Sequence, residues 1–248
     1  MAGLFDKQAE IYSDSRPTYP SEWFSKLAAL TSQHSLAWDA GTGSGQAALA
    51  VAEYFEQVIG TDISEAQLKH ARQHPRVKYI HTPLSLSDDE LVTLIGAVHW
   101  FELPKFYSIV KRLLRKPGGV IAVWGYNDSE VSPTFDPVMK RVRETTLPFY
   151  DPKAQCLFDG YRTLPFPFES VGLGSEGEPL QLDIQRVMSF EEMVRGLRSS
   201  SAVTKAKDQG LDLLPEEVIK ELVSAWGGPN VIKTVTIKAF MLAGKVKV

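Results

Sequence analysis

The sequence contains a single cysteine, Cys156, and carries little net charge. One cysteine excludes an internal disulfide framework and is typical of proteins from a reducing compartment. The 27 basic and 30 acidic residues give a net charge of −3, which offers no reason to expect nucleic acid or an anionic membrane as a partner. No apolar run approaches the length of a signal peptide or a membrane span. We therefore expect a cytoplasmic protein.

The sequence also lacks a convincing metal site. His70 and His74 lie four residues apart on an expected helix, but neither a third ligand nor the glutamate of a zinc-hydrolase pattern accompanies them. We therefore predict that no metal is bound. With 44% hydrophobic and 23% charged residues, the composition is that of an ordinary globular chain, and 248 residues are enough for one domain.

The most informative stretch is the glycine-rich sequence WDAGTGSGQAA at residues 38–48. An apolar run precedes it, and an alanine-rich segment with helical spacing follows it. The pattern predicts a strand-to-helix turn from Asp39 to Gly45, in which glycines let the backbone approach a ligand. The spacing from Gly43 to Ala48 also fits a dinucleotide-binding turn, so an NAD(P)-dependent oxidoreductase is one alternative.

Two acidic residues indicate which ligand this turn binds. A carboxylate at Asp39 would repel a pyrophosphate by on the order of 1–4 kcal/mol at effective dielectric constants of 80 to 20. S-adenosylmethionine has no phosphate, and its ammonium and sulfonium groups are both cationic. A second acid, Asp62, ends the next apolar run about 20 residues after the glycines, where a carboxylate can bind a ribose diol. This pair of acids favours S-adenosylmethionine.

The motifs DAGTGSG and GTDIS resemble the first two motifs of class I S-adenosylmethionine-dependent methyltransferases. AVHWF at residues 97–101 and the amino-terminal FDKQAEIYSDSRPTYP are similar to the type 11 small-molecule branch that includes trans-aconitate methyltransferase. The resemblance implies that S-adenosylmethionine binds and leaves as S-adenosylhomocysteine. It assigns to the cofactor site Asp39, Ala40, Gly41, Thr42, Gly43, Gly45, Asp62, Ile63, Ala97, Tyr12 and Arg16.

Strands alternating with helices predict an α/β fold, Rossmann-like and doubly wound, with a mostly parallel sheet. Alternating apolar residues at 180–184 and 231–243 predict an antiparallel carboxyl-terminal hairpin at the edge of that sheet. We expect a single domain over residues 1–248, with a core at 21–126 and 180–248 and a helical or irregular cap at 127–179. The resemblance adds a lid at residues 1–20 that folds over the cofactor.

Methyl transfer from a sulfonium needs positioned reactants and exclusion of water, not a nucleophilic residue or a metal. A carboxylate acceptor needs no base, whereas a hydroxyl or amine does. His99 is the only candidate base; the alternative is that it packs with Trp100 against the adenine of the cofactor or against the cap. We expect Trp100, Trp124, Tyr126 and Arg198 to contact the acceptor, with Arg198 holding a carboxylate. The predicted reaction is methylation of an oxygen of a small organic acid, and the oligomeric state stays open.

The chain is short of residues before Ala97. Between the third expected strand, at 76–83, and the helix expected around Phe106, this fold needs a helix, a turn and a central strand. A strand takes roughly 5–6 residues and a connection roughly 2–6 more. After the helix-like segment 91–96, only AVHWF remains. We predict that roughly a dozen residues are missing here, which makes a catalytically impaired isoform or binding protein the second alternative. A continuous strand over residues 94–101 would contradict this prediction.

Overall fold

The computed structural model describes residues 19–82 and 97–246. In chain order, its elements are α2 (Ser21–Ala29), β1 (Leu36–Ala40), α3 (Gln46–Ala52), β2 (Gln57–Asp62), α4 (Glu65–Lys69), β3 (Val77–His81), the 3₁₀ helix η2 (Val98–Trp100), α5 (Leu103–Leu113), β4 (Val120–Glu130), α6 (Asp136–Thr146), η3 (Leu147–Phe149), η4 (Pro152–Ala154), α7 (Gln155–Phe158), β5 (Glu169–Ser170), β6 (Leu180–Ser189), α8 (Phe190–Arg198), α9 (Ser201–Asp208), α10 (Glu216–Trp226) and β7 (Ile232–Lys245). No helix in these ranges is long and apolar enough to cross a membrane.

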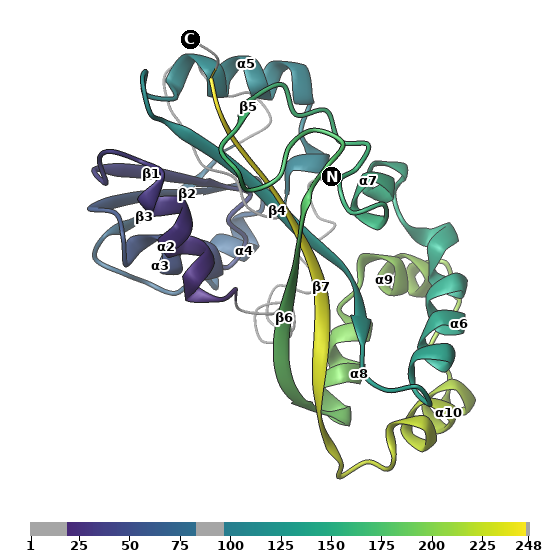
Figure 1. The fold of residues 1–248 in the computed structure, drawn as a ribbon. Coiled ribbons are helices and arrows are strands. Elements are labelled where there is room, and N and C mark those ends of the chain that lie inside the picture. Colours follow the sequence, from purple (N-terminus) through teal and green to yellow (C-terminus); the bar gives the residue numbers. More distant parts are fainter. Residues whose placement is uncertain (1–18, 83–96, 247–248) are drawn as a thin grey trace.

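The amino-terminal half forms a three-stranded parallel sheet in the order β1-β2-β3. Figure 1 shows α2, α3 and α4 gathered around these short strands. Ala37, Trp38 and Ala40 of β1 are buried, as expected for an apolar run inside a parallel sheet. Because the strands are parallel, the ends of β1 and β2 meet at one edge, with Ala40 opposite Thr61. This edge carries both predicted acidic residues.

Antiparallel strands form a second sheet in the order β4-β7-β5, with β6 also paired to β7. Figure 1 shows β4, β6 and β7 as long strands that cross the molecule side by side. The pairing of β6 with β7 confirms the antiparallel strands expected at the end of the chain. However, β7 lies between its neighbours and is not an edge strand. Residues 239–243 are all buried, so both of its faces are covered there.

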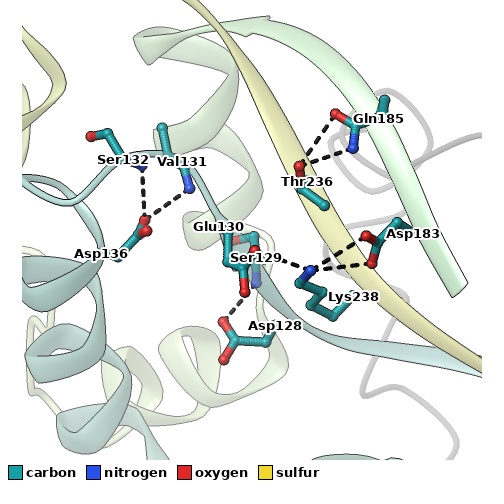
Figure 2. A network of polar contacts seen from close by, with 10 residues as sticks. All are labelled: Asp128, Ser129, Glu130, Val131, Ser132, Asp136, Asp183, Gln185, Thr236 and Lys238. Atoms are coloured by element: carbon teal, nitrogen blue, oxygen red, sulfur yellow. Dashed lines mark hydrogen bonds and ion pairs between the residues drawn. The ribbon is translucent and has the colours of Figure 1, made fainter. Parts of the chain in front are cut away.

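A polar network ties the three long strands together and directs the chain into α6. Lys238 of β7 lies 3.0 Å from Glu130 of β4 and 3.3 Å from Asp183 of β6 (Figure 2). The hydrogen bond to Glu130, followed by the bond to Asp183, raises the pKa of Lys238. Asp136, the first residue of α6, accepts two backbone N–H groups at one carboxylate oxygen. The donors are Val131 at 2.8 Å and Ser132 at 3.2 Å, which directly follow β4 (Figure 2). These bonds hold the residues that follow β4 against the first turn of α6.

Within the described residues, no strand joins β1 to β4. The α/β fold with parallel and antiparallel strands agrees with the sequence, but the described strands form two sheets where one mostly parallel sheet was expected. Val98–Trp100 is a 3₁₀ helix, so a continuous strand over residues 94–101 is excluded. The helix-like segment 91–96, which directly precedes Ala97, lies outside the described residues. The deletion itself therefore stays a prediction.

A cavity of about 270 Å³ lies between the beginnings of β1 and β4. Leu36 and Ala37 line it from β1, and Val120 and Ala122 line it from β4. Leu36 remains 52% exposed although it belongs to a strand. Apolar side chains of two strands beside a space that no described residue fills are what a missing strand between them would leave. The cavity thus supports the predicted deletion.

The segment 127–179, expected as the cap, lies beside helices from the carboxyl-terminal part of the chain. Strand β4 continues to Glu130, beyond residue 126 where the first part of the core was expected to end, before α6 begins. Figure 1 shows α8, α9 and α10, which the sequence assigned to the core, grouped with α6 beside the lower part of the second sheet. Helix α10 contacts α6, and α9 contacts η3. The expected cap segment therefore packs against helices from a separate part of the chain.

Candidate cofactor and acceptor site

The turn between β1 and α3 has the conformation that its glycines predict. Gly41, Gly43 and Gly45 have φ angles of +69°, +55° and +84°, in the left-handed region that favours glycine. The N–H groups of Gly41 and Thr42 both bind the carbonyl of Thr61, at 2.8 and 2.9 Å. A Cβ atom at Gly41 would lie only 2.3 Å from the Cβ atom of Ala97. Glycine is therefore required for the segment before η2 to approach the turn.

Asp39 is fully buried at the end of β1. The Thr42 hydroxyl donates a hydrogen bond to Asp39 Oδ2 at 2.6 Å. Asp39 Oδ1 has no hydrogen-bond partner among the described residues. Burial, with a smaller contribution from the charge of Asp62, raises the pKa of Asp39 to about 7. Among the described residues, Oδ1 of the ionised form thus lacks the partner that a cationic ligand would supply.

Asp62 joins the two turns that follow β1 and β2. Its Oδ2 accepts the N–H of Gly43 and its Oδ1 accepts the N–H of Ser64, both at 2.8 Å. The Ser64 hydroxyl in turn caps α4 by accepting the N–H of Gln67 at 3.2 Å. A carboxylate offers about four lone-pair sites, so Asp62 can also accept hydrogen bonds from hydroxyl groups. Ile63 follows directly and is half-buried.

The predicted cofactor residues that the structure describes gather at one edge of the parallel sheet. Asp39 and Ala40 end β1, the glycine turn follows them, and Asp62 with Ile63 comes from the end of β2. Ala97, which precedes η2, also lies at this edge, with its side chain against Gly41. Tyr12 and Arg16 lie outside the described residues.

His99 lies on η2 and is 8% exposed. Its Nδ1 is 3.2 Å from the hydroxyl oxygen of Tyr161, and its ring centre is 4.9 Å from that of Trp100. Burial lowers the pKa of His99 to about 4, although the charge of Asp151 acts in the opposite direction. The imidazole is therefore neutral at pH 7 and is a weak base there.

A cavity of about 370 Å³ begins at the glycine turn and extends between β4 and the cap. Of the predicted acceptor contacts, Trp100 and Tyr126 line it together with His99. The structure does not bring Trp124 or Arg198 to this cavity. Trp124 lies further back along β4, where its ring centre is 5.6 Å from those of Tyr19 and Phe24. Arg198 is exposed at the end of α8, because that amphipathic helix turns its apolar face inward.

Several polar residues of the cavity were not identified from the sequence. Arg143 of α6 forms an ion pair with Asp128, and Arg186 of β6 lies 3.8 Å from Glu192. The hydroxyl groups of Tyr150 and Ser200 are 2.9 Å apart. All six residues line the cavity, yet they come from separate elements, and no local motif marks them. In the described ranges, no cluster of His, Cys, Asp or Glu could hold a metal ion.

Residues 38–123 match a methyltransferase domain family. A solved structure described as a type II methyltransferase from Anaeromyxobacter dehalogenans is 34% identical, covers 93% of this chain and 97% of its own, and superimposes with a TM-score of 0.77. The chain belongs to the class I S-adenosylmethionine-dependent methyltransferases. Its cofactor is S-adenosylmethionine, and the NAD(P)-dependent alternative is rejected.

Two curated relatives of this methyltransferase agree with that assignment. A Dictyostelium discoideum protein named as a methyltransferase is 29% identical over 97% of this chain and 94% of its own length. A Saccharomyces cerevisiae protein named as an S-adenosylmethionine-dependent methyltransferase is 31% identical over 48% of this chain and 45% of its own length. The Dictyostelium alignment spans 255 residues, whereas this chain has 248. That relative therefore carries residues within the matched region that this chain lacks.

Proposed function

We propose that this methyltransferase transfers a methyl group from S-adenosylmethionine to an oxygen of a small organic acid. The observation that carries the proposal is the cavity of about 370 Å³ that connects the cofactor turn to the cap. Its volume lies in the range of roughly 300–1,000 Å³ that is common for small-molecule sites. Because α6, α8 and α9 line its far side, it favours a small acceptor over a macromolecule.

The residues at the glycine turn fit the cofactor. Asp39 would bind its cationic end, since Oδ1 is buried without a partner among the described residues. Asp62 would accept hydrogen bonds from the ribose hydroxyls, and Gly41 with Ala97 would close around the ligand. When bound, the cofactor supplies a methyl group on a sulfonium, which is a good leaving group. The protein's task is to hold the two reactants in line and to exclude water.

The state of His99 supports a carboxylate as the acceptor. An imidazole with a pKa of about 4 is poorly suited to remove a proton from a hydroxyl or amine near neutral pH. A carboxylate is already ionised and needs no base. Arg143 and Arg186 supply positive charge along the same cavity, although each has an acidic neighbour. We therefore expect an ester product.

The test is transfer of a labelled methyl group to a panel of small mono-, di- and tricarboxylic acids, with matched alcohols and amines alongside. We expect at least one acid to give a base-labile methyl ester. Arg143→Met should raise the KM of that acid more than tenfold, because a charge-assisted hydrogen bond contributes about 1.5–3 kcal/mol. Arg198→Met, outside the cavity, is the control and should leave KM unchanged. Transfer only to protein or RNA would overturn the proposal.

A methyltransferase-like binding protein with impaired catalysis is the second candidate. The observation that favours it is the unfilled space of about 270 Å³ between β1 and β4. A central parallel strand is normally buried on both faces, so its loss would weaken the sheet that carries the cofactor turn. Calorimetric binding of S-adenosylmethionine without turnover of any acceptor would favour this candidate. Binding with turnover would reject it.

A further inference from the structure

Tyr161 of the cap is held in an unusual conformation beside the site. It is fully buried, and it is the only non-glycine residue in the described ranges with a positive φ, +63°. This region costs on the order of 1–2 kcal/mol for a residue with a side chain. The Tyr161 N–H donates to the Cys156 carbonyl at 2.7 Å, and its ring meets Phe240 edge-on at 4.8 Å. The surroundings thus hold Tyr161 in a strained but defined position.

The Tyr161 hydroxyl has one recorded hydrogen-bond partner in the described part of the chain, which is His99 Nδ1 at 3.2 Å. Burial raises the pKa of Tyr161 well above its usual value, so the phenol keeps its proton. If His99 Nδ1 carried a proton and donated it, the Tyr161 O–H would be buried without an acceptor among the described residues, which costs about 1–3 kcal/mol. The arrangement that satisfies both groups has Tyr161 donating and Nδ1 accepting.

A neutral imidazole that accepts at one nitrogen carries its proton on the other. We propose that Tyr161 is a positioning residue whose O–H fixes His99 as the Nε2–H tautomer, so that His99 offers the acceptor cavity a hydrogen-bond donor. His99 lines that cavity, and Trp100 packs against its ring at 4.9 Å. The inference rests on the proposed function for the nature of the acceptor. In this role, His99 donates a hydrogen bond from Nε2–H to one oxygen of the acceptor carboxylate. It does not act as the general base that the sequence offered as one interpretation.

The proposal is tested by nitrogen NMR of protein labelled with ¹⁵N-histidine and saturated with S-adenosylhomocysteine. His99→Gln identifies the His99 signals among those of the five histidines. We expect a protonated Nε2 and an unprotonated Nδ1 in the wild-type protein. A wild-type His99 with its proton on Nδ1, or a positively charged His99 at pH 7, would overturn the proposal. This measurement needs no variant of Tyr161 and no turnover.

Tyr161→Phe removes the donor and should shift His99 towards a mixture of the two tautomers. The matched control is Tyr107→Phe, because Tyr107 is 4% exposed and its hydroxyl donates to the Pro165 carbonyl at 2.7 Å. That variant loses a comparable buried bond and should leave the His99 signals unchanged. An unchanged tautomer in Tyr161→Phe would contradict the positioning role.

With an acceptor in hand, Tyr161→Phe should raise the KM of that acceptor at least fivefold and leave the Kd of S-adenosylhomocysteine unchanged. Tyr107→Phe should change neither. If no acid is methylated but His99 is the Nε2–H tautomer, the proposed function fails and the tautomer assignment stands. If acids are methylated but Nδ1 carries the proton, only the role of Tyr161 fails.

Discussion

At the scale of single residues, Asp39 has the most consequential environment. Burial raises its pKa from 3.8 to about 7. Between these two pH values the folded protein keeps a proton that the unfolded chain releases. Through this group, the stability of the ligand-free protein is therefore greatest below the unfolded pKa and falls as the pH rises towards 7. A cation bound beside Asp39 lowers its pKa, so binding releases that proton.

We predict that S-adenosylmethionine binds about tenfold more tightly at pH 6 than at pH 5, because one proton is released for each ligand bound. The gain should level off above about pH 7, where Asp39 is already ionised in the free protein. Isothermal titration calorimetry over this range measures both the Kd and the proton release. Asp39→Asn cannot ionise and should bind more weakly, with no such slope. A wild-type Kd that does not change with pH would contradict the prediction.

The geometry of the glycine turn and of the two acids beside it was predictable from the sequence because it is local. Glycines at 41, 43 and 45 are needed for a bend that the backbone itself dictates, and Asp39 and Asp62 end the two strands beside it. Trp124 shows where such reasoning fails. An aromatic residue near a strand end is equally suited to a site and to a core, and only the packing against α2 decides between them. Tyr161 could not be foreseen, because its contact with His99 joins residues 62 positions apart.

At the scale of elements, the helix α8 was predictable from its first turn. The Ser189 hydroxyl accepts the N–H of Glu192 at 3.2 Å, and the Glu192 carboxylate accepts the N–H of Ser189 at 2.8 Å, as a capping box requires. By contrast, residues 97–101 form no strand, and the 3₁₀ helix η2 begins after Ala97, which lies against Gly41 of the glycine turn. Which side of the sheet α8 covers depends on contacts between distant segments.

The docking of Ala97 on Gly41 is testable by paired substitutions. Gly41→Ala places a Cβ atom 2.3 Å from the Ala97 Cβ atom, so we predict a loss of at least about 2 kcal/mol in unfolding free energy and a matching loss of cofactor affinity. Ala97→Gly should restore part of both in the double variant, with a coupling energy of about 0.5–3 kcal/mol. Urea unfolding measures the stability, and calorimetry measures the binding.

Gly177→Ala is the control for these variants. Gly177 has a φ of +78° and nothing lies within 4 Å of the position its Cβ atom would take. It reports the conformational penalty alone, on the order of 1–2 kcal/mol. If Gly41→Ala destabilises no more than Gly177→Ala, then Ala97 does not approach the turn as closely as the structure shows.

At the scale of the whole molecule, the described strands form two sheets whose facing strands, β1 and β4, are paired on one side only. The space of about 270 Å³ between their beginnings is lined by apolar side chains of both strands and by polar residues of the turn at 31–35. The Dictyostelium relative has residues in the matched region that this chain lacks. The unpaired sides of β1 and β4 and the space between them are what the predicted deletion before Ala97 would leave. If a strand is missing, inserting the corresponding segment of a relative should restore it.

We predict that replacing residues 83–96 with the corresponding segment of the Dictyostelium relative raises the unfolding free energy by on the order of 3 kcal/mol. A central strand buries several apolar side chains, each of which contributes about 1.5–3 kcal/mol. The conformational entropy lost when the strand becomes ordered offsets part of this gain. Hydrogen exchange of the β1 and β4 amides should slow in the same chimera. A glycine and serine segment of equal length at the same place is the control, because it adds loop entropy and no strand. If the two chimeras are equally stable, no strand is missing at this position, and the cavity between β1 and β4 belongs to the native fold.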